Sequence, residues 1–270
     1  IVEPGQPYLP TITTYYAVEP GKTFSVQAVI EETQIHEDVD LLPFDSWENE
    51  SDGSVEEGNV YLQNQVFPEN IATVSGPIVF RDITMVQVSI TPFQYNPATK
   101  TLVAIQDMDI ELIENGETQE IPFIPQKRSR EFEKLYESLI VNYSSLSRDN
   151  IEYQRPAILY VLPNNIGNLF GTVEQLMDWK KRVGYDVQFV SSSNVVNNRN
   201  NLKNYIDDAY ENWDNPPVHV TIVGDADGNY DIPTWSESYS GYNGEGDHPY
   251  TTLEGNDPYP EVLIGRISFS

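Results

Sequence analysis

The chain has 270 residues, and its 17 Tyr, 10 Phe and 4 Trp supply enough apolar surface for two packed domains. The 42 Asp and Glu against 15 Lys and Arg give a formal net charge of −27, which excludes binding to nucleic acid or anionic membranes through bulk electrostatics. The absence of cysteine excludes disulfides, thiolate zinc sites and a cysteine nucleophile within these residues. The sequence also lacks any run of about 20 apolar residues that could span a membrane.

Residues 1–125 are predicted to form an antiparallel β-sandwich. Short apolar or alternating runs, among them residues 60–67, recur between Pro-Gly and Asn-Pro turns, and no helical period interrupts them. Apolar and polar side chains alternate over residues 85–90, which predicts a strand with one buried face. Residues 45–59 are acidic and rich in Gly and Ser, so we expect a solvated loop there.

Residues 126–155 are predicted to be a helical connector that ends in a polar linker. Apolar side chains recur at helical spacing at Phe132, Leu135, Leu139, Ile140 and Tyr143. The segment begins with a basic cluster, Lys127 to Arg130, that could pair with neighbouring acids or mark an exposed, protease-sensitive stretch.

Residues 156–270 alternate between strand and helix patterns. The predicted strands are AILYVL, YDVQFV and VHVTIVG, and the predicted helices are GTVEQLMDWKKRVG, closed by Gly184, and NRNNLKNYIDDAYENW. This alternation predicts a parallel sheet with right-handed crossovers. Ligand sites of such sheets lie beyond the carboxyl ends of the strands, where Gly224 and Asp225 must fall.

An acidic loop follows the third of these strands. Asp225, Asp227, Asn229 and Asp231 occupy alternate positions, as do the ligands of a loop that wraps a hard cation in oxygen. The loop is not an EF-hand, and a solvated acidic turn is the alternative interpretation. His248 is the most conspicuous histidine, but no G-x-S-x-G nucleophile elbow accompanies it. We therefore assign no catalytic residue within the chain.

Three segments resemble the start of the catalytic domain of the gingipain-type cysteine peptidases: MDWKKRVGYDV, VTIVGDADGNYDIP and LEGNDPYPEVLIGRIS. VQVSITPFQYNPATKTL resembles the pro-domain that precedes that enzyme. The resemblance implies a secreted or cell-surface zymogen that cleaves proteins or peptides. Its β-sandwich pro-domain (residues 1–125) would chaperone and inhibit a caspase-like α/β peptidase domain. The catalytic His and Cys are expected beyond Ser270, so the chain alone should be inactive, with the remainder of its own peptidase domain as its partner.

The resemblance also implies a structural calcium ion. Carried over residue by residue, its ligands would be the carboxylates of Asp257 and Glu261 and the carbonyls of Glu254 and Tyr259, with Asp225 contributing from the neighbouring strand end. Pro258 and Pro260 stiffen this loop without removing a carbonyl.

Family pro-domains are removed by cleavage after a basic residue shortly before the first catalytic-domain strand. Arg148 has the expected spacing, and Arg128, Arg130 and Arg155 are alternatives.

Two other classes of function stay open from the residues. The chain could be a carbohydrate-binding or adhesin-like module joined to an α/β partner, or a degenerate peptidase that acts in secretion. A Gly-His-Gly and a later Ala-Cys in the continuation of the chain would distinguish the active peptidase from both.

Overall fold

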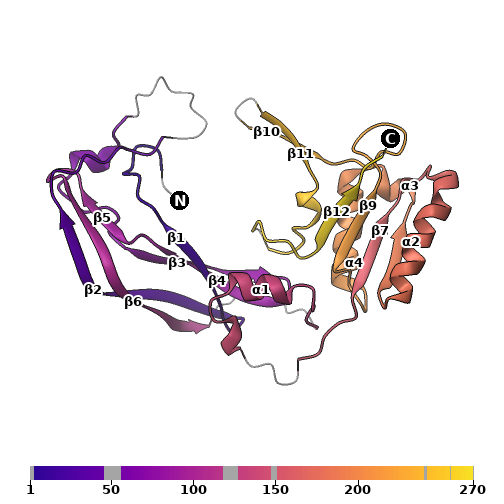
Figure 1. Ribbon diagram of the computed structural model, residues 1–270, viewed down its shortest axis with the longest axis horizontal. Coiled ribbons are helices and arrows are strands. Elements are labelled where there is room, and N and C mark those ends of the chain that lie inside the picture. Colours follow the sequence, from indigo (N-terminus) through magenta and orange to yellow (C-terminus); the bar gives the residue numbers. More distant parts are fainter. Residues whose placement is uncertain are drawn as a thin grey trace.

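The computed structural model describes residues 3–45, 56–117, 127–146, 151–239, 242–255 and 257–269. It has a mixed architecture, with antiparallel sheets in the N-terminal part and a parallel sheet covered by helices in the C-terminal part (Figure 1). The predicted combination of antiparallel and parallel sheets is therefore confirmed at this level.

The N-terminal part contains two three-stranded antiparallel sheets. The first has the order β1-β4-β3 and the second the order β2-β6-β5. The strands are β1 (Ile12–Ala17), β2 (Lys22–His36), β3 (Ala72–Phe80), β4 (Ile83–Ile90), β5 (Phe93–Asn96) and β6 (Thr101–Glu117).

Strand β4 lies at the centre of the first sheet, paired with β1 and β3. Met85, Val86 and Val88 are all buried, although successive residues of a strand point to opposite faces. The prediction of a single buried face is therefore wrong for the first half of β4. The connector covers the second face there, because Met85 packs in a cluster with Phe132 and Tyr136.

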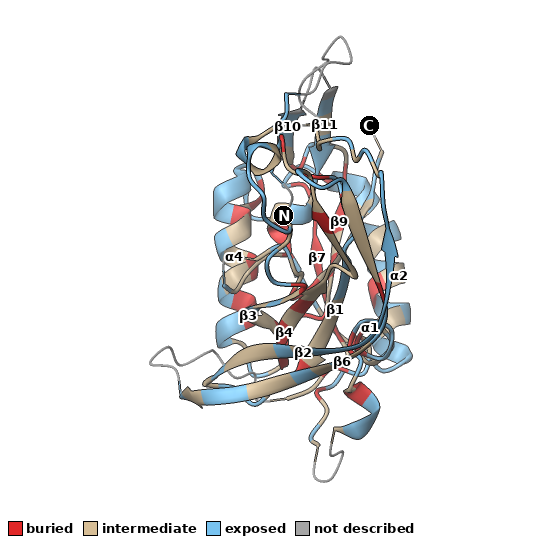
Figure 2. Cartoon of the chain, turned by 90° about the vertical axis from the view of Figure 1, so that its left-hand side faces the viewer, coloured by how far each residue is buried: buried red, intermediate tan, exposed pale blue. Residues whose placement is uncertain are grey.

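The second sheet is long and weakly buried. Strands β2 and β6 pair over most of their length with register shifts near Thr23 and Ile30, and much of their surface is exposed or half-buried (Figure 2). Val29, Ile30 and Ile35 are exposed on β2.

One predicted strand is absent. Residues 60–67 instead begin in a short 3₁₀ turn, η1 (Asn59–Leu62), and only Phe67 forms an isolated bridge, with Tyr95. The predicted acidic loop at residues 45–59 lies mostly outside the described residues, which omit residues 46–55.

The connector contains a shorter helix than its period predicts. Helix α1 (Glu133–Leu139) ends where Ile140 becomes extended and bridges to Tyr15 of β1, and η2 (Tyr143–Ser145) follows. Because the helix stops there, Leu139 is exposed, whereas Tyr136, which we did not predict to be buried, is fully enclosed. The connector is thus packed against β1 and β4 rather than loose.

The C-terminal part is built on a four-stranded parallel sheet of order β12-β9-β7-β8. Its strands are β7 (Ala157–Val161), β8 (Asp186–Val190), β9 (His219–Val223) and β12 (Leu263–Ile267). Alternate residues of β7 enter two different cores. Leu159 packs with Leu202 and Ile206, and Tyr160 packs with Met177. This burial on both faces accounts for the continuous apolar run in the sequence.

Helices α2 (Phe170–Arg182) and α4 (Arg199–Asn212) cover the two faces of this sheet, and η3 (Gly167–Leu169) and α3 (Ser193–Val196) precede them. Gly184 ends α2 with a φ of 107°, and its N–H donates to the Lys181 carbonyl, as the sequence predicted. The Asn198 side chain begins α4 by accepting from the N–H groups of Asn200 and Asn201.

A hairpin that we did not predict, β10 (Trp235–Tyr239) and β11 (Tyr242–Gly246), and η4 (His248–Tyr250) separate β9 from β12. None of the helices in the described part of the chain has the length and apolar character needed to cross a membrane.

Candidate functional site

The carboxyl ends of β9 and β12 meet at one edge of the parallel sheet, where Gly224 begins the acidic loop. Gly224 has a φ of 139°, and a Cβ there would lie 2.2 Å from the Tyr230 carbonyl oxygen, so only glycine fits. The Asp225 carbonyl accepts from the Ile232 N–H, which folds the loop into a closed turn beside the sheet.

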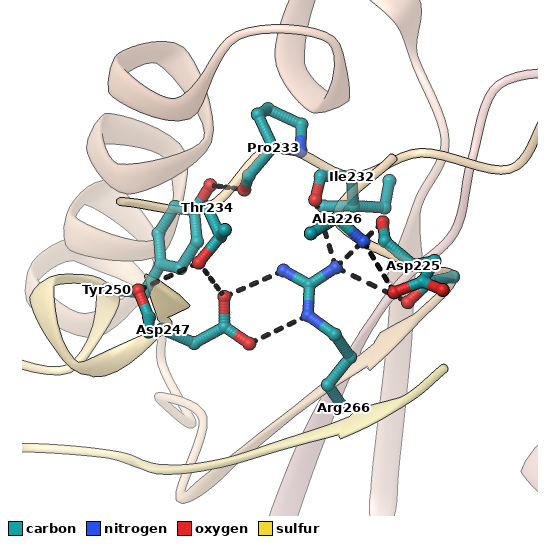
Figure 3. A network of polar contacts seen from close by, with 10 residues as sticks. Asp225, Ala226, Ile232, Pro233, Thr234, Asp247, Tyr250 and Arg266 are labelled. Atoms are coloured by element: carbon teal, nitrogen blue, oxygen red, sulfur yellow. Dashed lines mark hydrogen bonds and ion pairs between the residues drawn. The ribbon is translucent and has the colours of Figure 1, made fainter. Parts of the chain in front are cut away.

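Arg266, near the end of β12, organises this edge of the sheet (Figure 3). Its Nη1 donates to the carbonyls of Gly224 (3.3 Å), Asp225 (3.0 Å) and Ile232 (2.9 Å). Its Nε and Nη2 donate to the two carboxylate oxygens of Asp247, at 2.8 and 2.7 Å. The guanidinium therefore joins the loop after β9 to the segment that follows the hairpin.

Asp247 extends the same network. Its Oδ1 also accepts from the Thr234 hydroxyl at 2.9 Å, and the neighbouring Tyr250 hydroxyl donates to the Pro233 carbonyl (Figure 3). Both members of the Arg266–Asp247 pair are largely enclosed, with side-chain exposures of 13% and 15%. Such a fork of charge-assisted bonds fixes geometry as well as adding stability.

The acids predicted to wrap a cation after β9 are not gathered around a common point. Asp225 Oδ1 accepts from the Ala226 N–H, and the side chains of Asp227, Asn229 and Asp231 are exposed. The loop is organised instead by its backbone and by Arg266.

A second group of carboxyls lies in the loop that precedes β12. The Glu261 side chain is fully buried, and its Oε2 accepts from the N–H groups of Leu253 (2.7 Å) and Glu254 (3.3 Å). Glu254 Oε2 accepts from the Tyr210 hydroxyl at 3.4 Å. Among the described residues, Glu254 Oε1 and Glu261 Oε1 are buried oxygens without a hydrogen-bond donor.

These carboxyls have raised pKa values. Burial, and then the neighbouring Glu261 charge, raise the pKa of Glu254 to about 8. Burial raises the pKa of Glu261 to about 7 despite the two backbone donors, and burial also raises the pKa of Asp257. The charged forms are therefore disfavoured unless a cation compensates them.

The rest of the loop is positioned by Asp257. Its Oδ1 accepts from the Tyr259 N–H at 2.9 Å, and its Oδ2 lies close to the Cα of Gly255, within 3.1 Å of where a Cβ would be. The Tyr259 hydroxyl bonds to the Tyr15 hydroxyl of β1 at 2.5 Å. The loop is thus in contact with the N-terminal part.

Asp225 does not share this site. In the parallel pair, Leu263 at the start of β12 lies beside His219 at the start of β9, whereas Asp225 follows the end of β9. The five residues of β9 place the two ends roughly 15 Å apart. The structure therefore separates Asp225 from Glu261, contrary to our expectation that Asp225 would contribute to the calcium loop.

The described ranges contain no cluster of three or more His, Asp or Glu side chains arranged as metal ligands. A cation at the loop before β12 would therefore need backbone carbonyls as ligands in addition to carboxylates. The expected ligand set includes two such carbonyls, those of Glu254 and Tyr259. The Glu254 carboxyl also lies close enough to Glu261 for the Glu261 charge to raise its pKa.

The candidate processing residues differ in their contacts. The Arg128 Nε lies 3.3 Å from Asp82 Oδ2, and the Arg128 backbone forms an isolated β-bridge with Tyr153. The Arg155 side chain donates to the carbonyls of Gly184 and Tyr185. Arg130 is exposed and stacks over the Tyr153 ring at 4.2 Å. Arg148 lies outside the described residues.

His248 is exposed, and its Nε2 lies 3.0 Å from the Pro258 carbonyl oxygen. This contact joins η4 to the loop before β12. It is a structural contact of His248, to which we assigned no catalytic role.

His219, by contrast, should report on pH. Burial lowers its pKa from the usual 6.5, with Lys180 adding to this effect and Glu131 opposing it. As pH falls, His219 therefore takes up its proton at a higher pH in the unfolded chain than in the folded one. The contribution of neutral His219 to stability is complete above about pH 6.5 and is lost at lower pH. The free energy of unfolding, measured by chemical denaturation, should fall more between about pH 7.5 and 5.5 for the wild type than for His219→Gln. Equal losses would contradict this sign.

Sequence reasoning missed two functional features. Arg266 lies in the Ile-Gly-Arg segment that we quoted for its resemblance, yet nothing in the sequence revealed its five bonds. Arg81, in the turn between β3 and β4, is 2% exposed and had no signal beyond its place between two strands.

Comparison with known families divides the chain at the connector. Residues 1–151 match the family model Propeptide_C25, and residues 151–270 match the model Peptidase family C25. The two matches therefore cover consecutive parts of the chain.

Among curated relatives, Gingipain R2 of Porphyromonas gingivalis is 28% identical over 276 residues, which cover 99% of this chain and 36% of the relative. Gingipain R1 of the same organism is 27% identical over 272 residues, covering 98% of this chain and 26% of the relative. The chain thus spans 36% of the length of the first relative and 26% of the length of the second.

Among solved structures, a chain in the complex of the pro- and mature domains of Porphyromonas gingivalis RgpB is 30% identical with a TM-score of 0.46. The match covers 54% of this chain and 76% of that one. The Arg-specific cysteine proteinase gingipain R is 26% identical with a TM-score of 0.35, covering 43% and 25% of the respective chains. On the two family models, the chain belongs to peptidase family C25, as its propeptide followed by the N-terminal part of its peptidase domain.

Proposed function

We propose that the chain is the N-terminal portion of the zymogen of a cysteine endopeptidase, whose catalytic His and Cys lie beyond Ser270. The observation that carries the proposal is the order of a propeptide match over residues 1–151 followed directly by a peptidase match over residues 151–270. In this assignment residues 1–125 form a β-sandwich pro-domain and residues 156–270 belong to a caspase-like α/β domain. The parent protein is secreted or held at the cell surface and acts on proteins or peptides.

Contacts between the two parts support a pro-domain that chaperones and inhibits. Val218 of the peptidase part packs in one apolar cluster with Phe80, Met85 and Phe132. The Tyr15–Tyr259 hydrogen bond joins β1 to the loop before β12. A propeptide that packs this closely can support the folding of the peptidase domain and cover its surface until cleavage.

The proposed activity is tested on the parent protein extended beyond Ser270. We expect it to degrade casein only after the propeptide is cut, and to be blocked by iodoacetamide. The 270-residue chain serves as the control, because it has no cysteine and should neither degrade casein nor be alkylated at a thiol. A processed parent that is inactive and unlabelled would favour the degenerate peptidase.

We further propose a structural calcium ion in the loop before β12. Buried oxygens without a donor on Glu254 and Glu261 fit a hard cation, as does the turn built by Asp257. The calcium ion would supply positive charge to carboxyls that burial otherwise keeps protonated, and it would tie the loop to the sheet. Glu261 and Asp257 would contribute carboxylates and Glu254 and Tyr259 carbonyls, as the resemblance implies, and the Glu254 carboxyl would add a further oxygen.

For processing, we propose a cut after Arg148. The contacts of two alternatives support this choice, because cleavage after Arg128 would have to displace an ion pair, and cleavage after Arg155 two side-chain hydrogen bonds to backbone carbonyls. Amino-terminal sequencing of the mature parent should then give Asp149 as its first residue. Arg148→Gln should abolish that terminus, and Arg130→Gln, as the exposed control, should leave it unchanged. A mature terminus at residue 131 or 156 would contradict the assignment.

A further inference from the structure

The backbone conformation at Arg81 does not favour arginine. It lies in the tight turn between β3 and β4 with a φ of 54°, a conformation that favours Gly or Asn. Its side chain is nevertheless 2% exposed. A large charged residue in a strained turn, buried away from water, indicates that the side chain has a role beyond the turn.

The guanidinium of Arg81 enters the peptidase part at the amino-terminal ends of β9 and β12. Nη1 donates to the carbonyls of Pro217, at 3.3 Å, and Glu261. Nη2 donates to Gln154 Oε1 at 2.9 Å, and Gln154 is itself held by a bond to the Pro216 carbonyl. These acceptors are uncharged oxygens, arranged to accept from the fork of a planar guanidinium.

Two aromatic rings complete the enclosure. The Arg81 Cζ lies 5.1 Å from the centroid of the Phe132 ring and 5.4 Å from that of the Tyr210 ring, both within cation–π range. Phe132 comes from the connector and Tyr210 from α4. A planar guanidinium can use such rings and the acceptor fork together, which an ammonium group cannot.

We propose that Gln154, Tyr210, Pro217 and Glu261 form a guanidinium-binding pocket of the peptidase part, which Phe132 of the connector covers, and that Arg81 is the anchor by which the propeptide docks into it. The pocket also borders the loop before β12, because Arg81 binds the carbonyl of Glu261, whose side chain accepts from Leu253 in that loop. Docking of the propeptide therefore holds Glu261 and Leu263 in place. The proposal uses the zymogen assignment only to name the two parts.

The test is Arg81→Gly in the full chain, followed by hydrogen exchange. If Arg81 served only the turn, glycine at a φ of 54° would be neutral or stabilising. As an anchor, its loss should speed exchange of the Glu261 and Leu263 amides, which bond to Thr251 and Val218, by about tenfold or more. Exchange in β2 and β6 reports whether the N-terminal part remains folded.

Lys100→Gly is the matched control. Lys100 is also a basic residue at positive φ (52°) in a hairpin turn of the same part, but it is exposed and forms an ion pair with Asp40 at the surface. Its replacement should leave exchange of the Glu261 and Leu263 amides unchanged. An effect equal to that of Arg81→Gly would overturn the proposal, because it would show a general response to loosening of the propeptide.

Chemical rescue distinguishes a guanidinium pocket from ordinary packing. Methylguanidinium at roughly 10 mM should restore much of the slow exchange to Arg81→Gly, whereas urea and methylammonium should not. Equal rescue by urea, or exchange within twofold of the wild type before rescue, would overturn the proposal.

If Arg81→Gly does not fold, Arg81→Lys provides the measurement. It should show intermediate exchange that methylguanidinium does not change, since its own side chain fills the pocket. Wild-type exchange in Arg81→Lys would contradict a requirement for guanidinium. All these readouts are independent of peptidase activity, so they can fail or succeed whatever the parent enzyme does.

Discussion

Replacing Arg266 with alanine is expected to lower the free energy of unfolding of the peptidase part by about 3–5 kcal/mol. The substitution removes all five bonds of the guanidinium and leaves Asp247 as an enclosed carboxylate without its partner. The cost comes mainly from that uncompensated charge and from three carbonyls that lose a donor. Arg266→Lys should recover part of the loss through its charge, but it cannot form the fork.

Urea denaturation followed by tryptophan fluorescence measures this loss, because Trp179, Trp213 and Trp235 all lie in the peptidase part. Arg182→Ala, at the exposed end of α2, is the control and should change the free energy by less than about 0.5 kcal/mol. In the double variant Arg266→Ala/Asp247→Ala, the loss should be smaller than the sum of the single losses, because the stranded carboxylate is gone. Additive losses, or a loss below about 1 kcal/mol in Arg266→Ala, would show that the network does not act as a unit.

Local periodicity predicted much of the peptidase part. The run at β7 is apolar throughout because both of its faces are covered. Gly184 terminates α2 at its C-terminus, and Asn198 caps the N-terminus of α4. The failures occurred where tertiary contacts override a local pattern. Residues 60–67 have the composition of a strand but begin in a 3₁₀ turn, and α1 stops when Ile140 joins β1.

The structure brings only part of the expected ligand set together, for a topological reason. Glu254, Asp257 and Glu261, which the resemblance implies as ligands, belong to one continuous loop, where sequence neighbours are also spatial neighbours. Asp225 was assigned to the same site because both segments adjoin strands, but in a parallel pair the end of one strand and the start of the next lie at opposite edges. That error could have been avoided from the predicted sheet alone.

Arg81 could not have been found in this way. Its partners are as far away in sequence as Glu261, 180 positions later, and two of its acceptors are backbone carbonyls, which carry no residue signature. Its burial and its bonds in the structure distinguish it from Lys100, a surface residue in a hairpin turn that also has a positive φ.

Calcium is expected to raise the melting temperature of the chain, and the size of the effect depends on the affinity. A site occupied only in the folded state stabilises by about 2.7 kcal/mol at a hundredfold excess of calcium over Kd. For the roughly 115 residues of the peptidase part, that corresponds to a shift of about 10 °C relative to chelator. Calorimetric melting in calcium and in EDTA measures it, at about pH 8, so that Glu261, with a pKa of about 7, is mostly ionised. The same melting temperature in both would contradict the proposed site.

The variant Glu261→Gln gives the sharper form of this prediction, because its effect should change sign with the metal. Glutamine keeps the shape and one acceptor for the Leu253 and Glu254 N–H groups, but it removes a buried charge whose Oε1 has no donor among the described residues. In EDTA the variant should therefore melt at or above the wild type, whereas in calcium it should melt below it. Asp227→Ala, at the opposite edge of the sheet, should keep the full calcium shift. If Asp227→Ala lost the shift and Glu261→Gln kept it, the cation would have to lie in the loop after β9, because the two loops are separated by the length of that strand.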